Sequence, residues 1–279
     1  MGRGWSAIVA AATRRLDAAG VASPRVDAEL LAAHVAGVER GRLIVAEPPG
    51  PEQIDEYESV VARRERREPL QHILGIVAFR RVELAVGPGV FVPRPETELV
   101  VEALLAAVSD VPDPVIVDLC SGTGAIALSI ATERPDATVF AVERDPGAWH
   151  WMTRNLAGSS VRAVDADAVD PTTLSEWDGR CAAVISNPPY VPSSVAVSTE
   201  VEIDPAIAVF GGDDGLSVIR PLVDRIFALL APGGVTAIEH DDTHEVVVPD
   251  LLRAKGFTQV RPHRDLAGKP RFTMAVKPT

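Results

Sequence analysis

Strand-like and helix-like segments alternate through the second half of this 279-residue chain. The alternation predicts a doubly wound α/β fold with a mostly parallel sheet, because parallel strands are joined by right-handed helical crossovers. Ligands of such sheets bind at the carboxyl ends of the strands. The expected strands are Val115–Leu119, Thr138–Val142, Val161–Val164, Ala182–Ser186, Val235–Glu239 and Thr273–Val276. The expected helices are Glu96–Ser109, Ala125–Glu133, Gly147–Asn155 and Leu216–Leu230.

The first 70 residues have a purely helical pattern. Trp5–Ala19 is apolar at helical spacing and stops at Gly20. A second helix is expected to begin with Ser23 as N-cap and Pro24 in the first turn, and a third covers about Glu52–Arg67. The core face of the second helix is expected to consist of Val26, Leu30, Leu31 and Val35.

The C-terminal end of the third helix is strongly basic, and cations there complement the helix dipole. The cluster is open to two interpretations: a solvated helix end, or a patch that contacts an acidic or RNA-bearing partner. Its members are Arg63, Arg64, Arg66 and Arg67.

Two short β-type runs follow the helical region. Val77–Phe79 and Val82–Val86 are predicted to form a hairpin that joins two domains. We place the boundary near residue 82. Residues 1–82 then form a small all-α domain with the start of the hairpin linker, and residues 83–279 form the α/β domain.

Charge and cysteine content exclude several classes of protein. A net charge of −12 and a pI near 5.0 argue against an enzyme that grips bare DNA or RNA through its phosphates. Cys120 and Cys181 lie far apart and form no C-x-x-C pair, so they indicate neither a disulfide framework nor a zinc site. No apolar run approaches the roughly 18 residues of a membrane span. We therefore expect a cytoplasmic protein with no membrane segment, no direct nucleic-acid contact and no metal.

An apolar strand breaks into a glycine turn at the start of the α/β region. Val115–Leu119 leads into Cys-Ser-Gly-Thr-Gly, where Gly122 and Gly124 let the backbone turn tightly and approach a ligand. Nineteen residues after Gly124, Glu143 ends the next strand, where a carboxylate can accept hydrogen bonds from both hydroxyls of a ribose. Together these features indicate a site for an adenosine-containing cofactor.

The turn departs from two other nucleotide-binding signatures. It lacks the third glycine of a dinucleotide fingerprint, since Ala127 and Leu128 stand where a phosphate needs room, and no Gly-Lys-Ser/Thr of a P-loop follows. A cofactor with a ribose but no phosphate fits better. The motif therefore predicts S-adenosylmethionine.

The tetrapeptide Asn187-Pro188-Pro189-Tyr190 directly follows the strand Ala182–Ser186. The lone pair of a planar NH₂ group is delocalised, so its nitrogen is a poor nucleophile unless acceptors bind both N–H groups. The Asn187 side-chain oxygen and the Pro188 carbonyl can supply these acceptors, while the prolines stiffen the turn. Tyr190 offers a flat apolar face to a planar group. The motif predicts methyl transfer to such a nitrogen without a general base.

These motifs resemble those of the amino-group methyltransferases, which modify adenine N6, cytosine N4 or glutamine amides. Further strings narrow the resemblance to the release-factor glutamine methyltransferases, the HemK/PrmC family, over nearly the whole chain. The Pro-Arg-Pro-Glu-Thr-Glu string is specific to this family and its close relatives. The strings are Ser23–Leu31, Glu68–Gly75, Phe91–Glu98, Phe210–Leu216 and Asp265–Lys269.

The resemblance implies a Rossmann-like methyltransferase domain preceded by a helical domain that docks a peptide-chain release factor. The methylated group is then the glutamine of a Gly-Gly-Gln loop. The residues implied to hold the cofactor are Phe91, Cys120, Ser121, Gly122, Thr123, Gly124, Glu143, Asp167, Ala168 and Asn187. Those implied to hold the glutamine are Pro189 and the catalytic residues Asn187, Pro188 and Tyr190.

Two positions depart from the family pattern. Ala168 follows Asp167 where many members carry an aromatic residue, so adenine stacking from this position is not expected. After the fifth strand the family usually shows Glu-x-Gly-x-x-Gln, whereas residues 239–244 read Glu-His-Asp-Asp-Thr-His, so we expect a remodelled loop. Its His-x-x-x-His spacing lies in a loop and is not the helical His-Glu-x-x-His zinc motif.

The sequence thus predicts N5-methylation of a release-factor glutamine. Two alternative functions share the catalytic sequence motifs. A glutamine methyltransferase of a large-subunit ribosomal protein is disfavoured because the N-terminal segments resemble the release-factor enzymes. A nucleic-acid adenine-N6 methyltransferase is disfavoured by the negative net charge. A catalytically inactive binding module is disfavoured because both motifs are intact.

Overall fold

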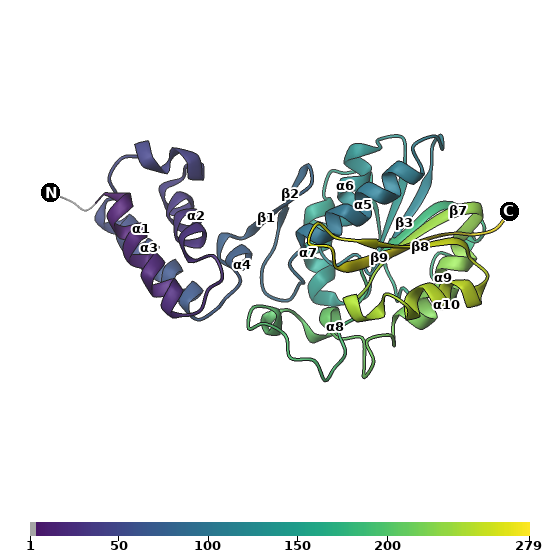
Figure 1. Ribbon diagram of the computed structural model, residues 1–279. Coiled ribbons are helices and arrows are strands. Elements are labelled where there is room, and N and C mark those ends of the chain that lie inside the picture. Colours follow the sequence, from purple (N-terminus) through teal and green to yellow (C-terminus); the bar gives the residue numbers. More distant parts are fainter. Residues whose placement is uncertain (1–3) are drawn as a thin grey trace. The chain divides into compact units, whose positions relative to one another are not determined.

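The computed structural model describes residues 4–279, which divide into two compact units (Figure 1). The first unit contains the chain up to Ile76 and, in addition, the short segment Ser198–Ile203. The second unit contains Val77–Val197 and Asp204–Thr279. The helical and the α/β regions of the sequence therefore form separate units, while the boundary near residue 82 stays a prediction.

The helical unit has a core centred on Tyr57, which is fully buried. The Tyr57 ring meets the Trp5 ring edge-on, with 5.9 Å between the centroids, and its hydroxyl donates to the Ala28 carbonyl at 3.0 Å. The only polar atom of this side chain is thus satisfied inside the core, as buried polar groups require. The elements are α1 Trp5–Ala18, α2 Pro24–Ala36, η1 Arg40–Val45, α3 Pro51–Glu65 and α4 Leu70–Leu74.

Helix α2 differs from its prediction in two details. Pro24 occupies the first turn as expected, but the Ser23 side chain makes no cap hydrogen bond. Val26 is 37% exposed and Leu30 is only partly buried, so of the expected core face only Leu31 and Val35 are buried. Small residues let α2 pack closely instead, and its buried apolar face consists of Ala28, Leu31, Ala32, Ala33 and Val35.

Two arginines at the end of α3 are held by carboxylates. Arg64 is buried, and it donates to Asp27 at 2.8 Å and to Glu200 at 2.9 Å. Arg67 donates to both Glu200 oxygens, at 2.8 and 2.6 Å. Because Glu200 belongs to Ser198–Ile203, these bonds fasten that segment within the helical unit. The interpretation of a solvated helix end is therefore wrong for Arg64, whereas Arg67 is paired but stays partly exposed.

The second unit contains a seven-stranded sheet in the order β5-β4-β3-β6-β7-β9-β8. The first five strands of this order run parallel, and β9 is antiparallel to both β7 and β8. The predicted mostly parallel sheet is confirmed. The strands are β3 Val115–Leu119, β4 Thr138–Glu143, β5 Arg162–Asp165, β6 Cys181–Ser186, β7 Leu230–Glu239, β8 Thr258–Arg264 and β9 Pro270–Val276.

Strand β8 was not predicted, because it lies at the sheet edge and is largely exposed. Its sequence has no apolar alternation, and Pro262 is tolerated only because an edge strand leaves one side unpaired. The predicted hairpin is present as β1 Ile76–Phe79 and β2 Val82–Ala85, which form a separate two-stranded sheet.

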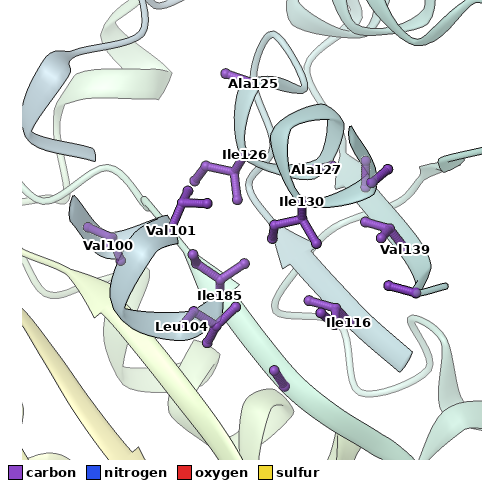
Figure 2. Packing of buried hydrophobic residues seen from close by; sticks show 14 of the residues in the cluster. Val100, Val101, Leu104, Ile116, Ala125, Ile126, Ala127, Ile130, Val139 and Ile185 are labelled. Atoms are coloured by element: carbon purple, nitrogen blue, oxygen red, sulfur yellow. The ribbon is translucent and has the colours of Figure 1, made fainter. Parts of the chain in front are cut away.

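Helices cover both faces of the large sheet, so successive β3 residues enter different cores. Ile116 belongs to one core and Val117 to the other. Figure 2 shows the first core, to which α5 contributes Val101 and α6 contributes Ile130, near Ile116 of β3. The helices are α5 Pro95–Ala107, α6 Ala125–Glu133, α7 Pro146–Leu156, α8 Ala206–Val209, α9 Ile219–Leu229 and α10 Val247–Lys255. Among residues 4–279, no helix combines the length and apolar character needed to cross a membrane.

The strand order determines where a ligand can bind. From β3 the chain passes to β4 on one side, and it later returns to β6 on the other side of β3. The connections diverge at this point, and open α/β sheets bind ligands in the resulting crevice at the carboxyl ends of the strands. The loops that follow β3, β4, β5 and β6 are therefore placed to build the site.

Candidate active site

A cavity of about 310 Å³ lies at the carboxyl ends of β3 to β6. This volume is at the lower end of the range for small-molecule sites. Of the residues singled out in the sequence, its lining includes Phe91, Cys120, Ser121, Gly122, Thr123, Glu143, Asp167, Ala168, Asn187 and Pro189. Gly124, Pro188 and Tyr190 lie outside the lining.

The two glycines of the turn after β3 have different structural roles. Both adopt a left-handed backbone, with φ of +56° at Gly122 and +80° at Gly124, which favours glycine. A Cβ at Gly122 would meet nothing within 4 Å, so the turn leaves open space there. A Cβ at Gly124 would lie 3.2 Å from Met152 and Leu156, so this glycine lets the turn before α6 approach α7 closely. Gly122 is thus the glycine that leaves room for a ligand.

Glu143, the last residue of β4, is oriented by backbone N–H groups. Its Oε2 accepts from Gly122 at 2.9 Å, and its Oε1 accepts from Arg144 at 2.8 Å and Asp145 at 2.7 Å. A carboxylate has about four acceptor positions, so capacity remains at Oε2. The acid is therefore held rigidly beside the open turn, with an acceptor available to a hydroxyl donor.

The charge of the lining is mostly negative. Glu143, Asp145 and Asp167 contribute carboxylates. Arg144 also lines the cavity, but its guanidinium is paired with Asp167 at 2.6 Å. A phosphate would be repelled by this set of charges, whereas a cationic ligand without phosphate would be attracted.

The Asn-Pro-Pro-Tyr segment connects the cavity to the end of β7. Asn187 and Pro189 line the cavity, and Asn187 Nδ2 donates to Thr97 Oγ1 at 3.2 Å. The Tyr190 hydroxyl donates to Glu239 Oε1 at 3.0 Å. Burial, together with the charge of Glu239, raises the pKa of Tyr190 well above its usual value, so this phenol stays a hydrogen-bond donor.

Thr97 and Glu239 were not predicted as site residues. The Thr97 hydroxyl donates to Glu239 Oε2 at 2.7 Å, and both side chains are buried. Glu239 ends β7, which is parallel to β6, and an acid at this edge of the sheet is a signal that points to the site. Thr97 gives no comparable chemical signal, although it lies in the Pro-Arg-Pro-Glu-Thr-Glu string. Other lining residues that no chemical motif marked include Pro205, Ile207, Ala208, Ser217 and Val218.

Two family models match the chain. The PrmC N-terminal domain matches residues 7–75, and the Methyltransferase small domain matches residues 82–203. A release factor glutamine methyltransferase of Mycolicibacterium smegmatis is 49% identical over 96% of this chain and 96% of that protein. One of Streptomyces coelicolor is also 49% identical, again over 96% of each chain. The chain belongs to the release factor glutamine methyltransferases.

Solved structures agree with this assignment at the level of the fold. A 16S rRNA methyltransferase (RsmC) of T. thermophilus, in complex with AdoMet and guanosine, has a TM-score of 0.53 and 22% identity. The match covers 72% of this chain and 49% of that chain. The chain thus spans about half of that protein, and the likeness concerns the methyltransferase fold alone.

The first departure from the family pattern is Ala168, which brings no aromatic ring to the cavity. Ala168 is buried in the core on one face of the sheet and contributes only a methyl group to the lining. Aromatic surface comes instead from Phe79 and Phe91. The Arg94 guanidinium lies over the Phe91 ring, 4.8 Å from its centroid, and also pairs with Asp204 at 2.6 Å.

The second departure is the loop after β7, whose histidines bind protein groups. His240 Nε2 lies 2.9 Å from Thr273 Oγ1, and its Nδ1 lies 2.9 Å from the Asp241 carbonyl. His244 Nε2 lies 3.0 Å from the Asp214 carbonyl. The two imidazoles therefore form hydrogen bonds with different parts of the protein. Within the described residues 4–279, no group of three His, Cys, Asp or Glu is arranged to hold a metal.

Proposed function

We propose that this protein transfers a methyl group from S-adenosylmethionine to the side-chain nitrogen of the glutamine in the Gly-Gly-Gln motif of peptide-chain release factors. One observation carries the proposal: Asn187 of the amide-binding motif and Glu143 of the ribose-binding motif line the same cavity. The names of relatives that match nearly the full length favour a release factor over a ribosomal protein or adenine as the substrate.

The residues of the cavity fit S-adenosylmethionine. The open space at Gly122 and the oriented Glu143 suit a ribose, and the carboxylates of the lining suit a ligand with positive charge and no phosphate. When bound, the cofactor supplies an electrophilic methyl group. Glu143 would hold its ribose hydroxyls, while Phe91 and Ala168 would provide apolar surface.

The protein's part in the reaction is to bind and orient the glutamine amide. The Asn187 side-chain oxygen and the Pro188 carbonyl each accept one of its N–H groups, which localises the nitrogen lone pair and directs it toward the methyl donor. No side chain has to remove a proton beforehand, because the methylated nitrogen becomes acidic and loses its extra proton to water. Tyr190 supports this segment through its bond to Glu239.

The helical unit would recognise the folded release factor, since a Gly-Gly-Gln loop is too small to identify its protein by itself. The net charge of −12 favours a protein partner over bare nucleic acid, and a cytoplasmic location follows from a substrate that acts in translation.

The test is a labelling competition. The protein is incubated with methyl-labelled S-adenosylmethionine and an equal mixture of release factors, ribosomal proteins and RNA, and the products are separated. We expect label on the release factor, and none when the glutamine of its Gly-Gly-Gln motif is replaced by alanine. Label confined to ribosomal protein or RNA would overturn the proposal.

A further inference from the structure

Glu239 is a buried acid whose oxygens are bound by hydroxyl groups. It is 1% exposed at the end of β7. Oε2 accepts from the Thr97 hydroxyl at 2.7 Å, and Oε1 accepts from the Tyr190 hydroxyl at 3.0 Å. One carboxylate is therefore linked to both ends of the Asn-Pro-Pro-Tyr segment, because Thr97 also contacts Asn187 at 3.2 Å.

The direction of these bonds follows from the number of protons available. When Glu239 is ionised, its carboxylate can only accept, so Thr97 gives its single hydroxyl proton to Glu239. The Thr97 oxygen then has only lone pairs to offer Asn187, and it can bind the NH₂ end of that amide but not the carbonyl end. The Asn187 Oδ1 is thereby left to face away from Thr97, toward the cavity that Asn187 lines.

This orientation matters for the chemistry. A glutamine amide brings two N–H donors, which need an acceptor. An Asn187 side chain turned by 180° would present its own N–H groups, so donor would face donor and the activation of the nitrogen would be lost.

We propose that Glu239 is a positioning residue for methyl transfer: by fixing the Thr97 proton, it sets which end of the Asn187 amide meets the substrate. The proposal rests on the proposed glutamine methylation. Glu239 touches neither substrate nor cofactor in this scheme, and it acts through Thr97 and Tyr190.

Burying this carboxyl group is unfavourable for folding, and a residue with a merely structural role would not need to be an acid. Desolvation raises the pKa of Glu239 to about 7, although the bonds from Thr97 and Tyr190 and the charge of Arg271 oppose the shift. A neutral side chain of the same shape would suit folding better, so the acid at this position favours a functional role.

The test uses Glu239→Gln, which keeps the shape but can donate a proton to Thr97. The Thr97 hydroxyl is then free to donate to Asn187 Oδ1, and the amide can turn. We expect kcat on the release factor to fall about 10²-fold, as for a lost preorganised partner. The Kd for S-adenosylmethionine and the KM for the release factor should not rise, and the melting temperature should not fall.

Three further variants separate orientation from other effects. Thr97→Val removes the connecting hydroxyl, so adding Glu239→Gln to it should cost little more, whereas Thr97→Ser should recover most of the loss. Glu96→Gln, an exposed acid whose charge acts on Glu239, is the matched control for a change of charge alone, and at a pH above the pKa of Glu239 it should leave kcat near wild type.

Two kinetic results would overturn the proposal: a Glu239→Gln variant with near-wild-type kcat, or losses from Thr97→Val and Glu239→Gln that multiply independently. A loss of cofactor affinity in step with kcat would also overturn it, since it would indicate a role in the cofactor site. Failure of the wild-type protein to label any release factor would instead defeat the proposed function, and the two failures are distinguishable.

Discussion

The backbone N–H of Gly122 donates to the Glu143 carboxylate at 2.9 Å, which ties the turn after β3 to the acid that ends β4. The contact brings together residues that are far apart in sequence, and it requires the left-handed backbone of Gly122. It orients the carboxylate before any ligand arrives, so that binding does not have to order this side chain.

Replacing Glu143 with alanine should weaken S-adenosylmethionine binding by about 1.5–3 kcal/mol, the range for a hydrogen bond to a charged group. Calorimetry of the free protein measures this directly. Glu143→Gln should also bind more weakly, because its NH₂ group would face a backbone N–H that Glu143 accepts from. An unchanged affinity in Glu143→Ala would place the ribose elsewhere.

Asn187→Ala should have the opposite pattern. The variant loses one preorganised acceptor for the substrate amide, so turnover should fall by about 10²–10³. Cofactor affinity should stay near wild type, because Glu143 and the glycine turn are untouched. Single-turnover methylation at saturating cofactor is the measurement, and a residual rate above roughly a tenth of wild type would contradict the proposed amide activation.

The rate should also depend on pH through Glu239. Its pKa is raised to about 7, mainly by burial, with Glu96 adding to the shift and Arg271 opposing it. As the pH falls through that value, Glu239 gains a proton that it can donate to Thr97, and the amide orientation is lost. The single-turnover rate should therefore fall on the acid side with an apparent pKa near 7. A flat profile between about pH 6 and 8 would contradict this.

The same pKa shift predicts how stability depends on pH. The folded protein holds a proton on Glu239 up to about pH 7, whereas the group titrates near 4.5 when unfolded. Between these values the folded state binds more protons, so the contribution of Glu239 to the free energy of unfolding falls as the pH rises. Glu239→Gln should remove this contribution, and denaturant unfolding at pH 8 should find the variant at least as stable as wild type.

The regular part of the fold was predictable because it is encoded locally. The apolar run of β3 was predicted to the residue, and the paired motifs at Gly122 and Glu143 follow from strand–turn–helix chemistry. The connection from Thr97 to Glu239 was not, since it depends on how α5 packs against β6 and β7. The place of Glu200 in the helical unit could not be predicted either, because no local pattern indicates an ion pair with Arg64, 136 positions away.

The last prediction concerns the buried charge network of the helical unit. Arg64→Ala would leave the buried Asp27 without its guanidinium partner, which should destabilise this unit by about 3–5 kcal/mol. Every lining residue of the cavity belongs to the second unit, so calorimetry should find the same affinity for S-adenosylmethionine. Methylation of an intact release factor should fall steeply if the helical unit recognises it, because remote contacts that hold the glutamine in place are lost.

A short Gly-Gly-Gln peptide separates recognition from catalysis. It cannot reach the helical unit, so it should be a poor substrate for the wild type and should lose little more in Arg64→Ala. The neighbouring Arg66 is exposed, and Arg66→Ala is the matched control that should leave both substrates unaffected. If Arg64→Ala reduced peptide and protein methylation equally, the helical unit with its Ser198–Ile203 segment would have to help build the active site, and the docking role would fall.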